Sequence, residues 1–387
     1  MFNIIDNPKR FCGNKMKKIS ILIFLTLVLY QVESFGVIER RNAKALSGLV
    51  VGKEVDLNSN LFSLSEESFP EVQQYLNYIL DIEELSSVEK KIISKVPLKK
   101  EKEAAVKLKP KVAKFCKKVS KRFLHYGWGR SKRSSYSWNH VRNSVTGDPL
   151  IWVTYGNEAL HKKKPKNTTL IFCGVHGDEI TPVKFCYDIM KHVRKNQQAY
   201  KEKLIVIAPI VNPDSFFRRR PTRTNYRGID INRNFPTRDW RKSALKMWKR
   251  RYRKDKRRYP GKKPLSEPEV IFQVNLIKRY KPNKIISVHA PLTIIDYDGP
   301  TNKSQNFKKA SQLLVQMSRK ASGYRIKNYP FFPGSLGNWA GNERGIPTYT
   351  LELPSSDNRK HKEYWRLFKS AIHAALLKDF RVSKETL

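Results

Sequence analysis

Short apolar runs alternate with amphipathic segments over most of the second two thirds of the chain. Five runs rich in β-branched residues and bounded by Gly, Pro or Asn predict buried strands, at residues 150–154, 170–175, 204–208, 285–288 and 348–353. Helical periodicity occurs between them, near residues 181–195, 267–280 and 304–322. This alternation predicts an α/β fold with helices on both faces of a sheet, and functional side chains where strands end.

The preceding part of the chain has a different pattern. Residues 61–122 have the periodicity of helices, with one apolar stripe formed by Val72, Tyr75, Leu76, Ile79 and Leu80. Residues 90–122 carry 14 basic and 2 acidic side chains. Apolar residues still recur among the lysines, so a solvated helix face is favoured over a dedicated binding arm.

One long apolar run lies near the start. Residues 19–30 follow Lys17 and Lys18 and are fewer than the roughly 20 residues that a membrane span needs. The pattern is typical of a secretory signal peptide over residues 1–34, with Met16 as an alternative start. We expect export to the periplasm or outside the cell, with no stable span after cleavage; an uncleaved anchor is the alternative.

These boundaries divide the chain into three parts. After the signal peptide, residues 35–122 form a basic and mostly helical region of unknown role, and residues 123–387 form the expected catalytic domain. Export would permit disulfides. The exported part has three cysteines, Cys116, Cys173 and Cys186, so at least one has no disulfide partner within the chain.

The charge of the chain narrows its partners. Lys and Arg number 77 against 34 Asp and Glu, which gives a net charge of +43. A hydrophobic fraction of 40% excludes a disordered basic tail. Residues 216–264 hold 20 basic and 3 acidic side chains, and we expect a surface loop or helix there. An anionic cell wall is favoured over nucleic acid as its partner, and a solubility role is the third reading.

Four side chains that can bind or activate a metal follow the predicted strands. His176 and Glu179 come directly after one strand, His289 ends another, and Glu352 ends a third. Two His and one Glu suit zinc and leave a coordination position for water. Three other interpretations remain open: His289 as a core histidine, Glu352 as a partner of arginines, and Asp178 as the ligand in place of Glu179.

Several motifs appear in the order found in the M14 zinc carboxypeptidases, and the chain resembles that family over residues 125–380. They are HxxE at residues 176–179, NPD at 212–214, GIDINRN at 228–234, His289 and Glu352. The resemblance implies a mixed eight-stranded sheet covered by helices. Within the family, the segments GDPLIW, RTNYRGIDINRNFP, SVHAPL and PGSLGNW are most similar to bacterial murein tripeptide amidases.

The resemblance also implies roles for the motif residues. His176, Glu179 and His289 would hold one Zn²⁺ per chain, and Asp230 would hydrogen-bond a ligand imidazole. Glu352 would act as the general base on the zinc-bound water, with a pKa raised by its apolar neighbours.

Further positions match the substrate-binding residues of the family. Arg223 would stabilise the oxyanion, although Arg218, Arg219 and Arg220 lie close in sequence. Asn232 and Arg233 would bind the substrate carboxylate. Tyr329 matches the mobile tyrosine of the family, with Tyr324 as the alternative.

The expected function follows from the same resemblance. We expect an exported hydrolase of peptidoglycan stem peptides that cuts the γ-D-Glu–meso-diaminopimelate bond. A carboxypeptidase for ordinary protein C-termini is the first alternative. Leu336, in the region that shapes the side-chain pocket, offers no charge for basic residues. A non-catalytic protein that binds walls or nucleic acid through its charge is the second alternative.

Overall fold

The structure, a computed structural model, describes residues 108–131, 136–163, 167–300 and 305–380. They belong to one compact unit that begins at Lys102. The predicted signal peptide and most of the predicted helical region at 35–122 lie outside the described residues. No helix within the described ranges is both long and apolar enough to cross a bilayer.

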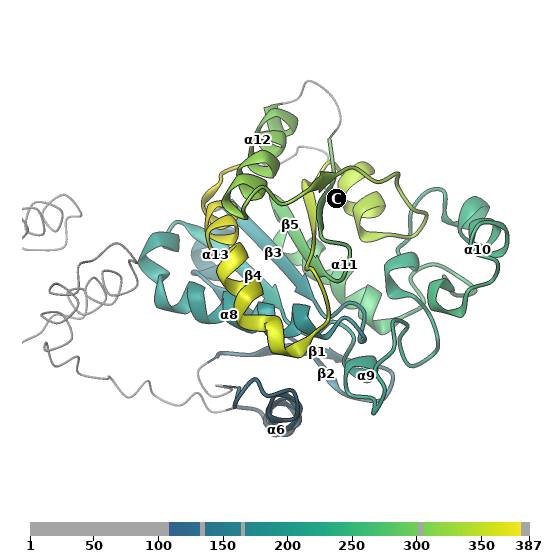
Figure 1. Ribbon diagram of the computed structural model, residues 1–387, viewed down its shortest axis with the longest axis horizontal. Coiled ribbons are helices and arrows are strands. Elements are labelled where there is room, and N and C mark those ends of the chain that lie inside the picture. The colour runs from purple at the N-terminus through teal and green to yellow at the C-terminus, as the bar shows by residue number, and fades with distance from the viewer. Residues whose placement is uncertain (1–107, 132–135, 164–166, 301–304, 381–387) are drawn as a thin grey trace, which may run out of the picture. The chain divides into compact units, whose positions relative to one another are not determined.

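A mixed sheet forms the centre of the described unit (Figure 1). Its eight strands lie in the order β1-β2-β4-β3-β5-β8-β6-β7. They are β1 (Asn139–Asn143), β2 (Pro149–Tyr155), β3 (Asn167–Cys173), β4 (Lys203–Ala208), β5 (Lys284–His289), β6 (Ile294–Asp298), β7 (Ile326–Lys327) and β8 (Thr348–Glu352). The four central strands β4, β3, β5 and β8 are parallel, whereas β2 and β6 run antiparallel to their central neighbours.

Helices cover both faces of this sheet, which confirms the predicted fold class. The helices are α6 (Pro110–His125), α7 (Glu158–Lys163), α8 (Ile180–Lys195), α9 (Pro213–Phe216), α10 (Leu245–Arg250), α11 (Pro268–Tyr280), α12 (Gln305–Lys320) and α13 (His361–Leu377). Side chains of α6, α8, α12 and α13 share one hydrophobic core, and those of α11 belong to the core on the opposite face. All five predicted strands and all three predicted helices are present.

The central strands are apolar throughout because both of their faces are covered. In β3, Ile171 packs into the core with α8, and the next residue, Phe172, packs into the core with α11. Both side chains are fully buried. Burial of one such side chain stabilises the fold by about 1.5–3 kcal/mol, so this uninterrupted pattern is strongly favoured as a central strand.

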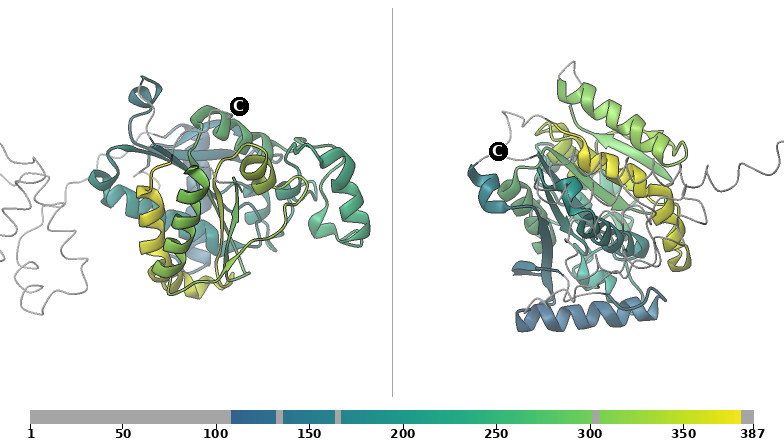
Figure 2. Two further views of the ribbon diagram at one scale, coloured as in Figure 1. Left: turned by 90° about the horizontal axis from the view of Figure 1, so that it is seen from above. Right: turned by 90° about the vertical axis from the view of Figure 1, so that its left-hand side faces the viewer.

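Helix α6 lies across the domain boundary expected between residues 122 and 123. Pro110 occupies its first turn, where a missing N–H costs no hydrogen bond. Val112, Phe115, Val119 and Phe123 recur at helical spacing, and all four are buried in the core shared with α8 and α13. Residues 110–122 therefore pack as part of the catalytic unit (Figure 2).

The basic stretch at residues 216–264 contains a peripheral excursion. It includes α10 and a short 3-10 turn at Lys256–Arg258. Figures 1 and 2 show α10 at the edge of the unit, away from α8 and α13. This agrees with the expected surface segment.

Candidate active site

The largest hollow near the sheet opens at the carboxyl ends of the parallel strands. It has a volume of about 840 Å³ and is lined by residues from three neighbouring strands, from the Arg223–Arg233 segment and from the basic excursion. All the residues that the sequence assigned to chemistry line this cavity, except Asp230. Strand ends and loops of parallel sheets are the usual place for such sites.

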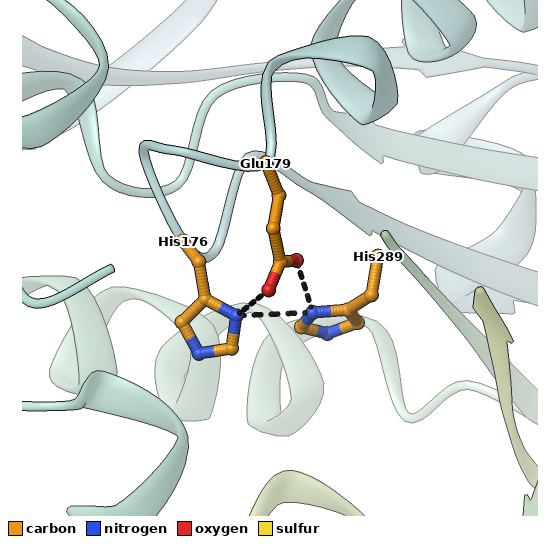
Figure 3. Close-up of side chains that lie close together, drawn as sticks. All are labelled: His176, Glu179 and His289. Carbon is orange, nitrogen blue, oxygen red and sulfur yellow. Dashed lines mark hydrogen bonds and ion pairs between the residues drawn. The ribbon is translucent and has the colours of Figure 1, made fainter. Parts of the chain in front are cut away.

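Three buried side chains converge at one point of the cavity (Figure 3). His176 follows β3, Glu179 precedes the first turn of α8, and His289 is the last residue of β5. Nδ1 of His176 lies 2.7 Å from Oε1 of Glu179, and Nδ1 of His289 lies 2.9 Å from Oε2 of the same carboxylate. The two Nδ1 atoms are 3.2 Å apart.

This donor set fits a zinc ion. Ligand atoms at about 2.0–2.1 Å from a tetrahedral zinc lie roughly 3.3–3.4 Å from one another. The two imidazole nitrogens have nearly this separation, and the ligand atoms of all three residues lie within 4.8 Å of one another. Imidazole and carboxylate are also the donors of open, catalytic zinc sites.

The alternative ligand, Asp178, lies outside this cluster. Its Oδ2 forms an ion pair with Nη1 of Arg257 at 2.8 Å. Asp178 therefore links the metal-binding loop to the basic excursion. Glu179 is the carboxylate that the fold directs toward the two imidazoles.

Each ligand imidazole has a polar partner on its other nitrogen. Nε2 of His176 lies 3.1 Å from Oδ1 of Asp230, and Nε2 of His289 lies 2.9 Å from Oγ of Ser287. Burial alone would raise the pKa of Asp230, but the charges of Arg223 and His176 hold it well below its usual value. Asp230 is thus an anion that orients His176.

Arg223 connects the metal site with its supporting carboxylate. Its Nε donates to Oδ2 of Asp230 at 3.0 Å, and its Nη1 donates to Oε1 of Glu179 at 3.1 Å. Arg218, by contrast, donates to the carbonyl of Tyr226 and does not line the cavity. Arg219 and Arg220 do not line it either. Among these four arginines, Arg223 alone is placed beside the three potential ligands.

Glu352 ends β8 directly opposite His289 in the parallel ladder. The backbone N–H of Leu292 lies 3.4 Å from its Oε2, and the residue is 9% exposed. Burial raises the pKa of Glu352; the charge of His289 opposes this rise and that of Glu179 adds to it. The direction agrees with the expectation from its apolar neighbours. No arginine neutralises this carboxylate in the described residues.

Asn232 and Arg233 lie on another wall of the cavity. Oδ1 of Asn232 accepts a hydrogen bond from the backbone N–H of Leu336 at 2.9 Å, which ties it to the opposite segment. The Arg233 guanidinium lies 4.6 Å from the ring centre of Phe332. Its Nε is buried and has no hydrogen-bond partner among the described residues.

The two candidate tyrosines have different surroundings. Tyr329 lines the cavity, and its backbone N–H donates to Oδ1 of Asp296 at 2.9 Å. Tyr324 is buried and donates its hydroxyl to the carbonyl of Glu352 at 2.7 Å, so it supports the strand end. Of the two, only Tyr329 borders the space that a substrate would occupy.

Sequence reasoning missed the polar side chains deeper in the cavity. Ser287, Thr350, Asp296 and Asp298 line it together with His289 and Glu352. Each lies two residues from another cavity residue on its own strand. The alternation of Ile295 and Tyr297 with two aspartates was the available signal for β6, but the strand is only five residues long.

A disulfide encloses the metal-binding loop. Cys173, the last residue of β3, is bonded to Cys186 in α8, so the loop contains both His176 and Glu179. Cys116 is buried in α6. The pairing could not be deduced from the sequence, where three cysteines left it open.

A cluster of two histidines and a glutamate beside a separate buried carboxylate, at the strand ends of a mixed α/β sheet, defines a metallohydrolase site. The family model for zinc carboxypeptidases, M14, matches residues 130–375. The chain belongs to this family and is therefore a hydrolase. This confirms the resemblance deduced from the motifs.

Two curated relatives and one solved structure illustrate the similarity. Murein peptide amidase A of Escherichia coli strain K12 is 29% identical over 227 residues, covering 58% of this chain and 84% of that protein. The Vibrio campbellii protein of the same name is 28% identical over 214 residues, covering 54% and 77%. Bovine thrombin-activatable fibrinolysis inhibitor, in complex with tick carboxypeptidase inhibitor, has a TM-score of 0.52 at 19% identity, covering 69% and 97%, and shares the fold.

Proposed function

We propose that this chain is an exported zinc peptidase that hydrolyses peptidoglycan stem peptides at the γ-D-Glu–meso-diaminopimelate bond. The convergence of His176, Glu179 and His289 beside Glu352 carries the hydrolase part of the proposal. The relatives named murein peptide amidase A support the substrate class. Water adds across the amide, the C–N bond breaks, and the products are a carboxylate and a free amine.

The side chains around the cluster have separate roles in this reaction. A zinc ion held by the three ligands supplies a Lewis acid and a water activated as a nucleophile near neutral pH. Glu352 accepts a proton from the attacking water on its carboxylate and passes it to the leaving nitrogen. A raised pKa suits this transfer, because the carboxyl must hold the proton briefly at neutral pH.

Arg223 and the pair Asn232 and Arg233 complete the assignment. Arg223 lies beside Glu179, where a positive charge stabilises the oxyanion that develops on the scissile carbonyl. Asn232 and Arg233 bind the carboxylate of the leaving residue, for which a planar guanidinium offers parallel donors. Tyr329 closes the cavity over the substrate.

Export is part of the proposal and has two supports. The basic and apolar pattern of residues 1–34 is typical of a signal peptide. The disulfide between Cys173 and Cys186 is a bond that persists in oxidising compartments such as the periplasm. The positive charge would then concentrate the enzyme on an anionic wall, which sedimentation with isolated walls at low and high salt tests; salt-independent binding would contradict it.

The decisive experiment uses the zinc-loaded protein with two substrates. L-Ala-γ-D-Glu-meso-diaminopimelate and a peptide with an ordinary C-terminus are incubated with wild type, Glu352→Gln and a surface control, Asp379→Asn. Mass spectrometry should show release of diaminopimelate by wild type and the control, and loss of release by Glu352→Gln. Cleavage of the ordinary peptide alone would favour the carboxypeptidase alternative, and cleavage of neither would favour a binding protein.

A further inference from the structure

The floor of the cavity is built from alternate residues of three adjacent strands. The pairs are Ser287 and His289 from β5, Thr350 and Glu352 from β8, and Asp296 and Asp298 from β6. In the antiparallel ladder of β6 and β8, Asp296 lies opposite Thr350 and Asp298 lies opposite Thr348. Since paired residues point to the same face, the two aspartates continue the row that begins at the metal ligands.

The intervening residues of β6 show that this orientation is determined by the core. Ile295 and Tyr297 are buried in the hydrophobic core on the other face of the sheet. A slip of the register by one residue would bury both aspartates there and expose the apolar pair. The two carboxylates are therefore held on the cavity side of the strand.

The end of the floor farthest from Glu352 is shaped around a carboxylate. A Cβ placed on Gly337 would stand 1.8 Å from Oδ2 of Asp298, so a larger residue at 337 would displace that side chain. No described residue forms a hydrogen bond or ion pair with the Asp298 carboxylate. Asp296 is 8% exposed, and its Oδ1 accepts from the backbone of Tyr329.

Positive charge lies within reach of these carboxylates. The charged groups that act on Asp298 are Asp296 and Arg233, which come from different elements. The buried Nε of Arg233 has no hydrogen-bond partner among the described residues, and the same residue lines the cavity. The floor therefore presents an unpaired cation and two carboxylates to one ligand.

The spacing along the strands gives the length of the ligand. Two residues of a strand span about 6.6–6.8 Å and neighbouring strands lie about 4.8 Å apart, so the Cα atoms of Asp296 and Asp298 lie roughly 8 and 14 Å from that of Glu352. A residue that leaves from the site beside Glu352 needs a long side chain to reach either carboxylate. A short or apolar side chain would leave buried charges without partners, which is costly.

We propose that Asp298 and Asp296 select a leaving residue whose long side chain ends in an ammonium group, while Arg233 binds its carboxylate. This inference rests on the proposed function and names the chemistry of the residue released, a diaminopimelate or lysine type. It also corrects the expectation drawn from Leu336: the charge that recognises a basic residue comes from β6 instead.

The acidity of Asp298 gives the binding a characteristic pH dependence. Burial and the charge of Asp296 raise the pKa of Asp298 to about 8, and Arg233 opposes this rise. An ammonium ligand binds the ionised carboxylate more tightly than the protonated one. Affinity should therefore increase as the pH rises from 6 toward 8, and binding at pH 7 should release a proton from the protein.

Titration calorimetry with free amino acids tests the proposal without relying on turnover. The zinc-loaded protein is titrated with meso-diaminopimelate, L-lysine and L-norleucine, which replaces the ammonium by a methyl group. We expect the two ammonium ligands to bind about 10- to 100-fold more tightly than norleucine in wild type and in Asp379→Asn. Asp298→Asn should remove most of this preference. Equal binding of lysine and norleucine, or an unchanged preference in Asp298→Asn, would overturn the proposal.

A second measurement needs no variant. Titrating wild type with lysine in two buffers of different ionisation enthalpy measures the released proton, and norleucine should release none. Should Asp298→Asn not fold, this difference decides the question. If the ligand preference is present while no γ-D-Glu peptide is cleaved, the proposed function is wrong and the inference stands. If peptides ending in diaminopimelate and norleucine are cleaved equally and no preference is found, only the inference is wrong.

Discussion

Oδ1 of Asp230 lies 3.1 Å from Nε2 of His176, on the side of the ring opposite the nitrogen that faces Glu179. A hydrogen on Nε2 leaves Nδ1 as the nitrogen with a free lone pair. The carboxylate thereby selects the tautomer that can bind a metal and holds the ring in place. The same carboxylate accepts a hydrogen bond from Arg223 through its other oxygen.

This relationship predicts the effect of Asp230→Asn on zinc binding. The amide lacks the charge that holds the imidazole and the guanidinium, so we expect zinc affinity to fall about 10- to 100-fold. Competition with a chromogenic chelator measures the affinity, and Asp379→Asn is the control because it lies outside the cavity. An affinity within twofold of wild type would show that Asp230 has no part in binding the metal.

The disulfide should contribute strongly to stability. Cys173 and Cys186 are separated by 13 positions in sequence, and closing a loop of this size stabilises a fold by about 3 kcal/mol. We expect the double variant Cys173→Ala/Cys186→Ala to lose about this much free energy of unfolding in urea. Reductant should destabilise wild type by a similar amount and leave the double variant unchanged. Insensitivity of wild type to reductant would contradict the prediction.

Glu269 should make the stability depend on pH. The residue is fully buried, and Oε1 has no hydrogen-bond partner among the described residues, whereas Oε2 accepts from Asn225 at 3.1 Å. Burial raises the pKa of Glu269 to about 7. The folded protein therefore binds this proton more tightly than the unfolded chain. The resulting stabilisation is fully present below about pH 4.5 and is lost as the pH rises through 7.

Glu269→Gln removes that ionisation. We expect the variant to be more stable than wild type at pH 8 by roughly 2–3 kcal/mol, with the difference shrinking toward pH 5. Chemical denaturation at both pH values measures it. Asp379→Asn should follow the pH profile of wild type, and a difference between Glu269→Gln and wild type that is the same at pH 5 and pH 8 would refute the assignment.

Two substitutions on α6 test whether this helix is part of the catalytic unit. Phe115 is 2% exposed and Leu124 is 52% exposed. Phe115→Ala should cost about 3–5 kcal/mol of unfolding free energy because it leaves a cavity in the core. Leu124→Ala should change the stability by less than about 0.5 kcal/mol. Similar effects at the two positions would mean that α6 does not share the core.

The sequence was informative about the metal site because its signals are local. His176 and Glu179 are three residues apart, and His289 and Glu352 each end an apolar strand, so strand prediction alone places them at one edge of a parallel sheet. The central strands were readable for a related reason. Burial on both faces requires a continuous apolar run, which few other structures produce.

Other parts of the site depend on contacts between distant segments. The strand β6 is short and half polar, so its pattern alone did not distinguish it from a loop. Its pairing with β8 places Asp296 and Asp298 in the cavity. Arg223 was distinguishable from its neighbouring arginines only by spacing, and its bonds to Asp230 and Glu179 are visible only in the folded chain.

By itself, the sequence determined the class of fold, the family and the three potential metal ligands, because short-range spacing and apolar periodicity encode them. The tertiary structure decided which cysteines pair, that α6 packs into the catalytic core, and that two aspartates form the floor of the cavity. Each of these depends on strand register or on packing between segments far apart in the chain, where a single residue's shift changes the face on which a side chain lies.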